Sequence, residues 1–229
     1  MSAVSAATLP VSLESRARQS RGTSHDAIYR MVREAVDRHA VARGRLVDVG
    51  CGTGTLFQVL GIQFRSYCGL DAVRYEAFPA AAGFHQVDLD APAWPEPAST
   101  ADVVVAVETI EHLENPWAFM RQLAALAVPG GLVIVTTPNQ LSLLSLVTLL
   151  VKRRFSAFQD VHYPAHRTAL LESDLRRAAE ASGLDVLDVV YSRHGRIPFT
   201  AWHYPRVVAA CLPRWCSDNL MIVARRARG

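Results

Sequence analysis

The fold is decided by the stretch Arg45-Leu-Val-Asp-Val-Gly-Cys-Gly-Thr-Gly54. Its apolar run of Leu46, Val47 and Val49 is typical of a short parallel strand that is covered on both faces. The glycines that follow allow the backbone to turn sharply, and the sequence predicts a helix that opens at about Thr55. A helix beginning there directs its free N–H groups and positive dipole end into the turn. The stretch therefore predicts a strand, a turn and a helix around a ligand site.

Glycine spacing separates two classes of ligand. A dinucleotide fingerprint reads G-x-G-x-x-G, whereas the glycines here follow G-x-G-x-G, which disfavours a nicotinamide-dependent oxidoreductase. An acid within the strand, Asp48, would repel a pyrophosphate and suits a cationic ligand. The pattern resembles the first motif of class I S-adenosylmethionine-dependent methyltransferases, whose ligand carries an ammonium and a sulfonium. This resemblance assigns one part of the cofactor site to Asp48, Gly50, Cys51, Gly52 and Gly54.

Two more acids are predicted to stand at or near strand ends. Asp71 follows Gly54 by seventeen residues, an interval that brings it beside the glycine turn in a right-handed βαβ unit. Its carboxylate can there accept both hydroxyls of a ribose, and Ala72 is assigned to the cofactor site with it. The family resemblance implies that Asp88 accepts from the adenine amine and that Leu89 packs against the ring.

The rest of the chain alternates between strand and helix patterns. Further strands are predicted at 66–71, 84–89, 102–107, 130–137, 184–191 and 219–225, with helices at 116–126 and 168–182. This order predicts an α/β fold with a doubly wound, mainly parallel sheet and a ligand cleft at the carboxyl ends of the strands. The family resemblance implies seven strands, the last of them antiparallel. One domain over 24–229 is expected, after a mobile arm over 1–23.

A helix is predicted before the first strand. Ser24 can cap it, and its apolar stripe extends to about Ala42. The helix could cover the ligand, which makes His25 and Tyr29 candidates for substrate contact.

Composition limits the class of protein and of partner. The chain has 24 basic and 21 acidic residues, and its arginines are scattered, so a nucleic-acid partner is not indicated. Four cysteines without a C-x-x-C pair indicate neither a disulfide framework nor a zinc site, and a cytoplasmic location is expected. Cys51 is interpreted as a small side chain tolerated in the turn rather than as a catalytic thiol. The N-terminal sequence shows no secretion signal.

Candidate catalytic residues follow the strand predicted at 102–107. The segment Glu108-Thr-Ile-Glu-His112 resembles the E-x-x-E-H of methyltransferases related to the ubiquinone-biosynthesis O-methyltransferases. The reaction implied is an in-line attack of a nucleophile on the sulfonium methyl. A phenol or alcohol must lose its proton, and histidine, with an unperturbed pKa of about 6.5, is a suitable base. We therefore predict that His112 is the base and that Glu108 belongs to the cofactor site.

A second interpretation uses these residues as a metal site. Glu108, Glu111 and His112, joined by His162 or His166, could hold a hard divalent cation such as magnesium. Bacterial small-RNA 3′-terminal 2′-O-methyltransferases carry a similar E-x-x-E-H with a later histidine. That resemblance implies a metal that activates a ribose hydroxyl, although the residues around the later histidines depart from their pattern. The first interpretation needs no metal.

An apolar insertion is expected between the fifth strand and the next helix. The stretch 141–151 is too short to span a bilayer. Arg153, Arg154 and Phe155 follow it, and the region of about 140–166 is interpreted as a lid over a hydrophobic or lipid-linked acceptor. A helix packed on the core and contact with a membrane surface are the alternatives.

The sequence as a whole predicts an S-adenosylmethionine-dependent methyltransferase acting on an oxygen of a small or lipid-linked metabolite. N- or C-methylation, methylation of an RNA 3′ end and a non-catalytic partner subunit are alternatives. The sequence does not name the acceptor or decide between a monomer and a homodimer.

Overall fold

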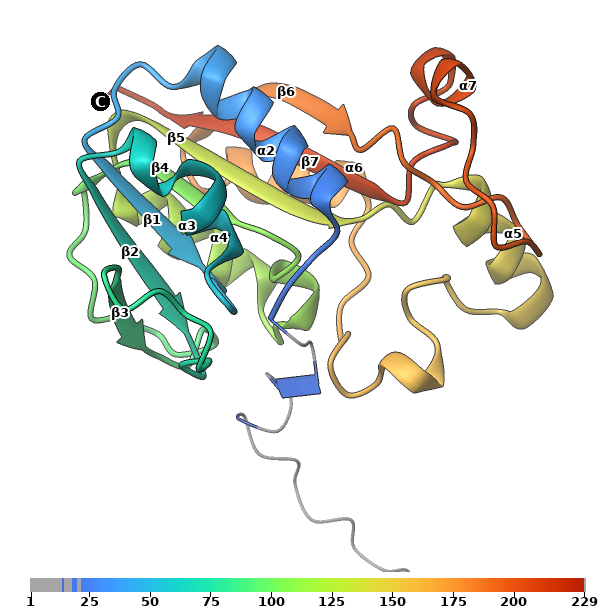
Figure 1. Ribbon diagram of the computed structural model, residues 1–229, viewed down its shortest axis with the longest axis horizontal. Helices are drawn as coiled ribbons and strands as arrows, with labels where there is room; N and C mark the ends of the chain where they lie inside the picture. Colours follow the sequence, from blue (N-terminus) through green and yellow to red (C-terminus); the bar gives the residue numbers. More distant parts are fainter. Residues whose placement is uncertain (1–13, 15–17, 20–21, 229) are drawn as a thin grey trace, which may run out of the picture.

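A computed structural model describes residues 14, 18–19 and 22–228, in which helices cover both faces of a seven-stranded sheet (Figure 1). The strand order is β3-β2-β1-β4-β5-β7-β6. Strands β1 to β5 pair in parallel, and β7 lies antiparallel between β5 and β6. The predicted doubly wound, mainly parallel sheet is confirmed. The strands are β1 (Arg45–Val49), β2 (Ser66–Asp71), β3 (Gly83–Gln86), β4 (Ala101–Ala106), β5 (Ala127–Pro138), β6 (Leu184–Tyr191) and β7 (Asn219–Arg226).

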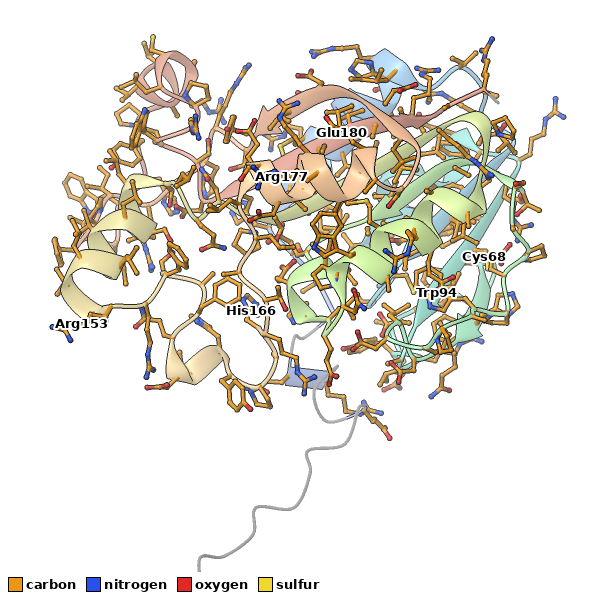
Figure 2. The ribbon with its side chains drawn as sticks, turned by 180° about the vertical axis from the view of Figure 1, so that it is seen from behind. Cys68, Trp94, Arg153, His166, Arg177 and Glu180 are labelled. Atoms are coloured by element: carbon orange, nitrogen blue, oxygen red, sulfur yellow. The ribbon has the colours of Figure 1, made fainter. Side chains whose placement is uncertain are left out.

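Two layers of helices enclose this sheet. Helices α2 and α3 contribute their apolar residues to the core on one face, and α4 and α6 cover the other face, which Figure 2 shows from behind. Helices α5 and α7 lie together at one end of the molecule. The helices are α2 (Asp26–His39), α3 (Thr55–Leu60), α4 (Pro116–Leu126), α5 (Leu143–Lys152), α6 (Glu172–Glu180) and α7 (Arg206–Cys211), with 3-10 turns η1 (Gly61–Gln63), η2 (Ile110–His112) and η3 (Asp160–His162).

Strand β1 shows why the sheet is covered on both faces. Leu46 packs in the core beneath α2 and α3, whereas Val47 and Val49 pack in the core beneath α4 and α6. Successive side chains of a strand point to opposite faces, so both cores draw on the same short run. The same alternation turns Asp48 toward the face covered by α2 and α3.

Three local predictions need correction. The residue that caps α2 is His25 rather than Ser24, because the His25 Nδ1 accepts from the Ala27 N–H at 3.1 Å. Strand β3 ends at Gln86, so the predicted strand end at residues 88–89 lies in the loop beyond it. Helix α6 begins at Glu172 instead of 168. The Thr168 N–H donates to the Glu111 carbonyl at 3.0 Å, so residue 168 lies in a loop that contacts the segment after β4.

The predicted arm over 1–23 falls mostly outside the described residues. Gly22 and Thr23 are described, and they lie against the glycine turn. The Thr53 N–H donates to the Gly22 carbonyl at 2.8 Å, and the Thr53 hydroxyl donates to the same oxygen at 3.1 Å. The part of the chain that packs on the fold therefore begins before residue 24.

The predicted lid region, 140–166, contains α5 and η3. The Leu143 N–H at the start of α5 donates to the Trp215 carbonyl at 2.9 Å, so this region is joined to the segment after α7. Figure 2 shows Arg153, which follows α5, at the tip of that end. Across the described part of the chain, no helix combines the length and the apolarity needed to cross a membrane.

Candidate active site

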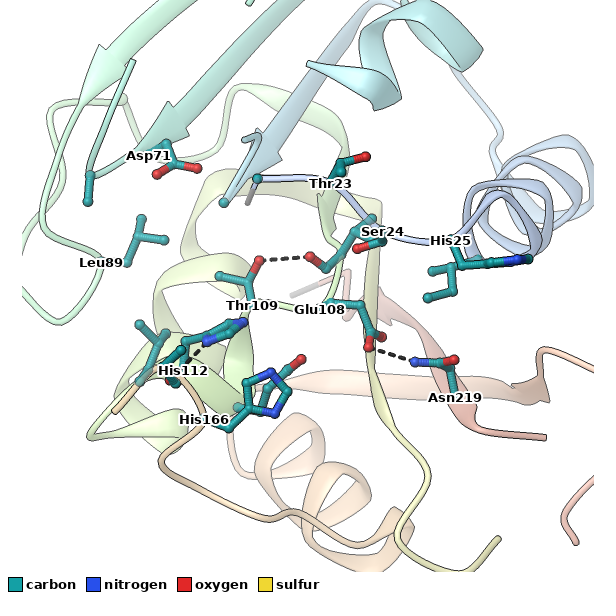
Figure 3. A pocket seen from close by; sticks show the side chains of 18 of the residues that line it. Thr23, Ser24, His25, Asp71, Leu89, Glu108, Thr109, His112, His166 and Asn219 are labelled. Carbon is teal, nitrogen blue, oxygen red and sulfur yellow. Dashed lines mark hydrogen bonds between the residues drawn. The ribbon is translucent and has the colours of Figure 1, made fainter. Parts of the chain in front are cut away.

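A cavity of about 380 Å³ opens at the carboxyl ends of the parallel strands (Figure 3). Ligands of doubly wound folds bind at this edge, and the volume lies in the usual range for small-molecule sites. Seven predicted site residues line the cavity, together with the residues of the alternative metal site. The predicted lining residues are Gly50, Asp71, Ala72, Asp88, Leu89, Glu108 and His112.

Asp71 presents a fixed carboxylate on the cavity wall. It is the last residue of β2 and is 8% exposed. Its Oδ2 accepts from the Gly52 N–H at 2.8 Å, and its Oδ1 accepts from the Val73 N–H at 3.2 Å. Burial raises the pKa of Asp71, while these backbone donors and His112 act in the opposite direction. The carboxylate is therefore held in place before any ligand binds.

Asp88 and Leu89 form the neighbouring part of the wall. Asp88 is exposed and Leu89 is buried, so one side chain offers an acceptor and the other an apolar surface. Asp90, which was not predicted, also lines the cavity and joins this loop to the segment before α4, because its Oδ1 accepts from the Glu114 N–H at 2.9 Å. Figure 3 places Asp71 and Leu89 on the same side of the cavity.

Four residues predicted to bind the cofactor do not line the cavity: Asp48, Cys51, Gly52 and Gly54. Asp48 is 1% exposed and accepts from the Tyr67 hydroxyl at 2.5 Å, in the core beneath α2. Burial raises the pKa of Asp48 to about 7. Gly52 is covered by the N-terminal segment, since a Cβ there would meet the Gly22 carbonyl oxygen at 2.0 Å. Strand alternation turns Asp48 toward the core, so it does not line the cavity, and its contact with a cationic ligand stays a prediction.

Glu108 is held by two side chains from other strands. It follows β4 in a left-handed conformation, with φ of 48°. Its Oε1 accepts from the Thr136 hydroxyl at 2.8 Å, and its Oε2 accepts from the Asn219 amide at 2.6 Å. Burial and the neighbouring Glu111 raise the pKa of Glu108 well above its ordinary value. Figure 3 shows the contact with Asn219.

His112 has a defined orientation at the cavity wall. It ends η2, and its Nδ1 lies 2.9 Å from the Ala165 carbonyl oxygen. Because a carbonyl only accepts, Nδ1 carries the proton in this contact and Nε2 is the nitrogen with an acceptor lone pair. The lid region thus sets the tautomer of the predicted base.

Glu111 and His166 each carry a buried polar atom without a hydrogen-bond partner among the described residues. The Glu111 Oε2 accepts from the Thr137 hydroxyl at 3.0 Å, but its Oε1 accepts nothing, and the carboxyl is fully buried. Burial raises the pKa of Glu111 to about 8. Burial, with His112 and His162 nearby, lowers the pKa of His166 to about 4. Such orphaned groups are costly unless something satisfies them.

Ligand atoms of Glu111, His112 and His166 all lie within 4.8 Å of one another. This group fits a cation, because it pairs a carboxylate oxygen with two imidazole nitrogens and would satisfy the orphaned atoms. Two members of the predicted alternative lie outside this group. Glu108 is outside the group because Thr136 and Asn219 hold its carboxylate. His162 is outside it too, and its ring stacks on that of His166 with 5.5 Å between the ring centroids.

A second group of potential ligands lies away from the cavity. Cys68, His85 and Glu96 bring their ligand atoms equally close. The Glu96 carboxylate, however, already forms an ion pair with the Arg45 guanidinium, which supplies the positive charge that a cation would bring. This group is best explained as a buried ion pair between β1 and the loop before β4.

Several lining residues were not predicted. They come from loops, from α2 and from β7, and they include Gly22, Thr23, Ile28, Thr109 and Asn219. Asn219 stands at the start of β7, and no local pattern marks it as a partner of Glu108. His25 and Tyr29, the predicted candidates for substrate contact, both line the cavity.

The sequence profile of a family described as "Methyltransferase domain" matches residues 24–189. The chain belongs to this methyltransferase family. It is an S-adenosylmethionine-dependent methyltransferase, as the resemblance of its glycine-rich stretch implied. The match includes the glycine turn, the acids beside it and the E-x-x-E-H segment, and it ends in β6.

Curated relatives of the methyltransferase agree with this assignment. A "probable S-adenosylmethionine-dependent methyltransferase" of Mycolicibacterium smegmatis is 26% identical over 85% of this chain and 71% of its own. A ubiquinone biosynthesis O-methyltransferase of Caulobacter is 32% identical over 50% of this chain. The chain spans about half the length of that enzyme, 48%.

Solved structures share the fold of the methyltransferase. A S-adenosylmethionine-dependent methyltransferase of Archaeoglobus fulgidus has a TM-score of 0.63 at 16% identity, over 91% of this chain and 97% of its own. A chain from the Haloferax volcanii complex between the Trm112 methyltransferase activator and a methyltransferase has a TM-score of 0.62 at 18% identity, over 93% and 95%. These similarities concern the fold alone.

Proposed function

We propose that the methyltransferase transfers the methyl group of S-adenosylmethionine to an oxygen of a small or lipid-linked acceptor, with His112 as the base. The observation that carries this proposal is the contact between the His112 Nδ1 and the Ala165 carbonyl oxygen. It directs the proton to Nδ1 and makes Nε2 the basic nitrogen at the cavity wall. A general base must first be placed within reach of the proton that it removes, and only then does its pKa decide its efficiency.

The cofactor is proposed to lie along the wall formed by Asp71, Ala72, Asp88 and Leu89. The two backbone donors on Asp71 support a role in holding ribose hydroxyls, because its carboxylate is already oriented. Asp88 would accept from the adenine amine beside the apolar Leu89. Gly50 and Glu108 line the same cavity and would complete the contacts. Cys51, Gly52 and Gly54 do not line the cavity and would act by shaping the turn that carries Gly50.

The proposed reaction is an in-line displacement at the methyl carbon of the cofactor. The acceptor oxygen attacks the methyl carbon, the carbon–sulfur bond breaks, and the sulfonium becomes a neutral thioether. The acceptor proton passes to the His112 Nε2. The positive charge of the sulfonium thus ends on the His112 imidazolium, and most of the catalysis lies in aligning the partners and excluding water. The lid region, through Ala165 and His166, borders this part of the cavity.

A second candidate is metal-assisted methylation, which the orphaned atoms of Glu111 and His166 favour. A bound cation would lower the pKa of an acceptor hydroxyl. Two imidazoles and one carboxylate suit manganese, cobalt or zinc better than magnesium, which prefers oxygen ligands. His112 would then be a ligand, with the Ala165 carbonyl fixing its tautomer. An RNA 3′ end is one acceptor for this chemistry.

The two candidates predict opposite results in one assay. Transfer of labelled methyl groups to a panel of phenols, alcohols, amines and short RNAs is measured with and without chelator. Transfer to a hydroxyl that persists in chelator and is lost in His112→Asn supports the base. Transfer that needs added metal and is lost in His166→Asn and Glu111→Gln supports the metal. Transfer only to amines or carbon would overturn both.

A further inference from the structure

Exposed apolar side chains are concentrated at one end of the molecule. Of the fourteen exposed large hydrophobic side chains in the described part of the chain, ten belong to two segments, 141–167 and 193–216. Phe199 is 84% exposed, Leu150 83% and Trp202 78%. The exposed side chains of these two segments are called the lid surface below. Scattered apolar residues need no explanation, but a concentration of this kind indicates an interaction site.

The two segments lie side by side. Besides the bond from the Leu143 N–H to the Trp215 carbonyl, the Asn139 amide donates to the Arg214 carbonyl at 2.7 Å. Figures 1 and 2 show α5 and α7 at the same end, remote from β3. The lid surface is therefore a feature of the fold rather than two unrelated loops.

Charge on the lid surface differs sharply from charge on the rest of the chain. The two segments contain eight of the 24 basic residues and one of the 21 acidic residues, which gives them +7 while the remainder carries −4. Seven of the eight basic side chains are exposed. The single acid, Asp160, forms an ion pair with Arg154. The partner of this surface must accept both apolar side chains and a large positive charge.

We propose that the lid surface docks the methyltransferase on an anionic lipid bilayer. Leucine, valine and phenylalanine side chains would enter the boundary between headgroups and acyl chains, and Trp202 would lie at the interface. Arg153, Arg206 and Arg214 would contact lipid phosphates. The proposed attachment is peripheral, through side chains of the lid surface alone. This inference does not rest on the proposed acceptor or base.

Other occupants fit the lid surface less well. Its exposed side chains carry seven basic groups and one acid, so two copies facing each other through it would bring +6 against +6. An RNA would satisfy the arginines but would leave aliphatic side chains such as Leu150 and Val207 in water. A bilayer satisfies both kinds of side chain at once. Binding of RNA or self-association through the lid surface would therefore contradict docking on a bilayer.

The test is co-flotation of the full chain with vesicles of phosphatidylcholine alone or mixed with phosphatidylglycerol. Binding is expected to be at least about tenfold stronger to the anionic vesicles and to weaken with salt. The double variants Phe199→Ser/Trp202→Ser and Arg206→Glu/Arg214→Glu should each lose about tenfold or more. The matched controls Ile62→Ser and Arg65→Glu alter exposed residues outside the lid surface and should bind as wild type.

Folding of every variant is checked by its affinity for S-adenosylmethionine, which the proposal expects to be unchanged. Failure to bind anionic vesicles, or equal loss in the controls, would overturn the proposal. So would tighter binding of RNA that competes with vesicles, or a dimer that dissociates in the Phe199→Ser/Trp202→Ser variant. Loss of methyl transfer with normal vesicle binding would count against the proposed function alone.

Discussion

Asn219 donates its side-chain amide to the Glu108 Oε2 at 2.6 Å, across 111 residues of sequence. The bond joins the start of β7 to a residue two positions beyond the end of β4, and both residues line the cavity. Glu108 also holds Thr136 on β5, so one carboxylate connects three strands at the ligand-binding edge. The geometry of the cavity thus depends on how β7 inserts between β5 and β6.

Replacing Asn219 by Ala should weaken cofactor binding. Glu108 would lose one of its two side-chain partners, and a lost hydrogen bond to a charged or buried group costs about 1.5–3 kcal/mol. We expect the Kd for S-adenosylmethionine, measured by calorimetry, to rise about tenfold or more. The matched control is Asn115→Ala, which removes the cap on the Ala118 N–H of α4. It should cost about 1 kcal/mol of stability and leave the Kd unchanged. Equal effects of both variants on Kd would contradict a role of Asn219 in holding Glu108 for cofactor binding.

Replacing Asp71 by Asn should nearly abolish cofactor binding. An amide retains the size of the carboxylate but can accept through one oxygen only, and the Gly52 and Val73 donors now use both. A loss of about 2–3 kcal/mol corresponds to an increase of about 30- to 150-fold in Kd. Asp37→Asn, on the exposed side of α2, is the control and should bind as wild type. Unchanged affinity in Asp71→Asn would remove Asp71 from the proposed ribose contact.

Strand positions were predictable because they depend on local patterns. The runs at 46–49 and 103–106 are apolar apart from Asp48. Gly183, with φ of 74°, lies in the turn after α6, and the helix ends at Glu180, two residues before its predicted end. The cavity was less predictable. Asp48 was placed in the site because it precedes the glycine turn, but the period of two in a strand turns it toward Tyr67. Asn219 reaches Glu108 only through strand order, which periodicity does not encode.

The choice among histidines also lay beyond the sequence. His162 and His166 are four residues apart in a segment without regular periodicity, so either could have joined Glu111. The fold decides, because the His166 ring lies 4.7 Å from that of His112, whereas His162 accepts the Gln159 N–H and stacks outside. The lid region therefore completes a site whose other members come from η2.

Asp48 should make stability depend on pH. Burial raises its pKa from 3.8 to about 7, so the folded state favours the protonated carboxyl. Its contribution to stability is complete below pH 3.8 and is lost as the pH rises through about 7. Asp48→Asn keeps an acceptor for Tyr67 and cannot ionise. The free energy of unfolding of the variant should exceed that of wild type by a margin that grows between those two pH values, to on the order of a few kcal/mol at most. Its Tm should rise accordingly. Parallel Tm curves for the two proteins would contradict a buried, titrating Asp48, and Asp37→Asn should show no such gain.

Divalent metal should stabilise the fold if Glu111, His112 and His166 form a cation site. A ligand at one hundred times its Kd adds about 2.7 kcal/mol to folding, which raises the Tm of a domain of this size by about 5–10 °C. We expect this shift with manganese or zinc after chelator treatment, and little with magnesium. Glu111→Gln and His166→Asn should remove the shift while retaining binding of S-adenosylmethionine. His85→Asn alters the group around Glu96 and should leave the shift intact. A shift lost in His85→Asn alone would place the metal between Cys68 and Glu96, and the absence of any shift would leave His112 to act as a base.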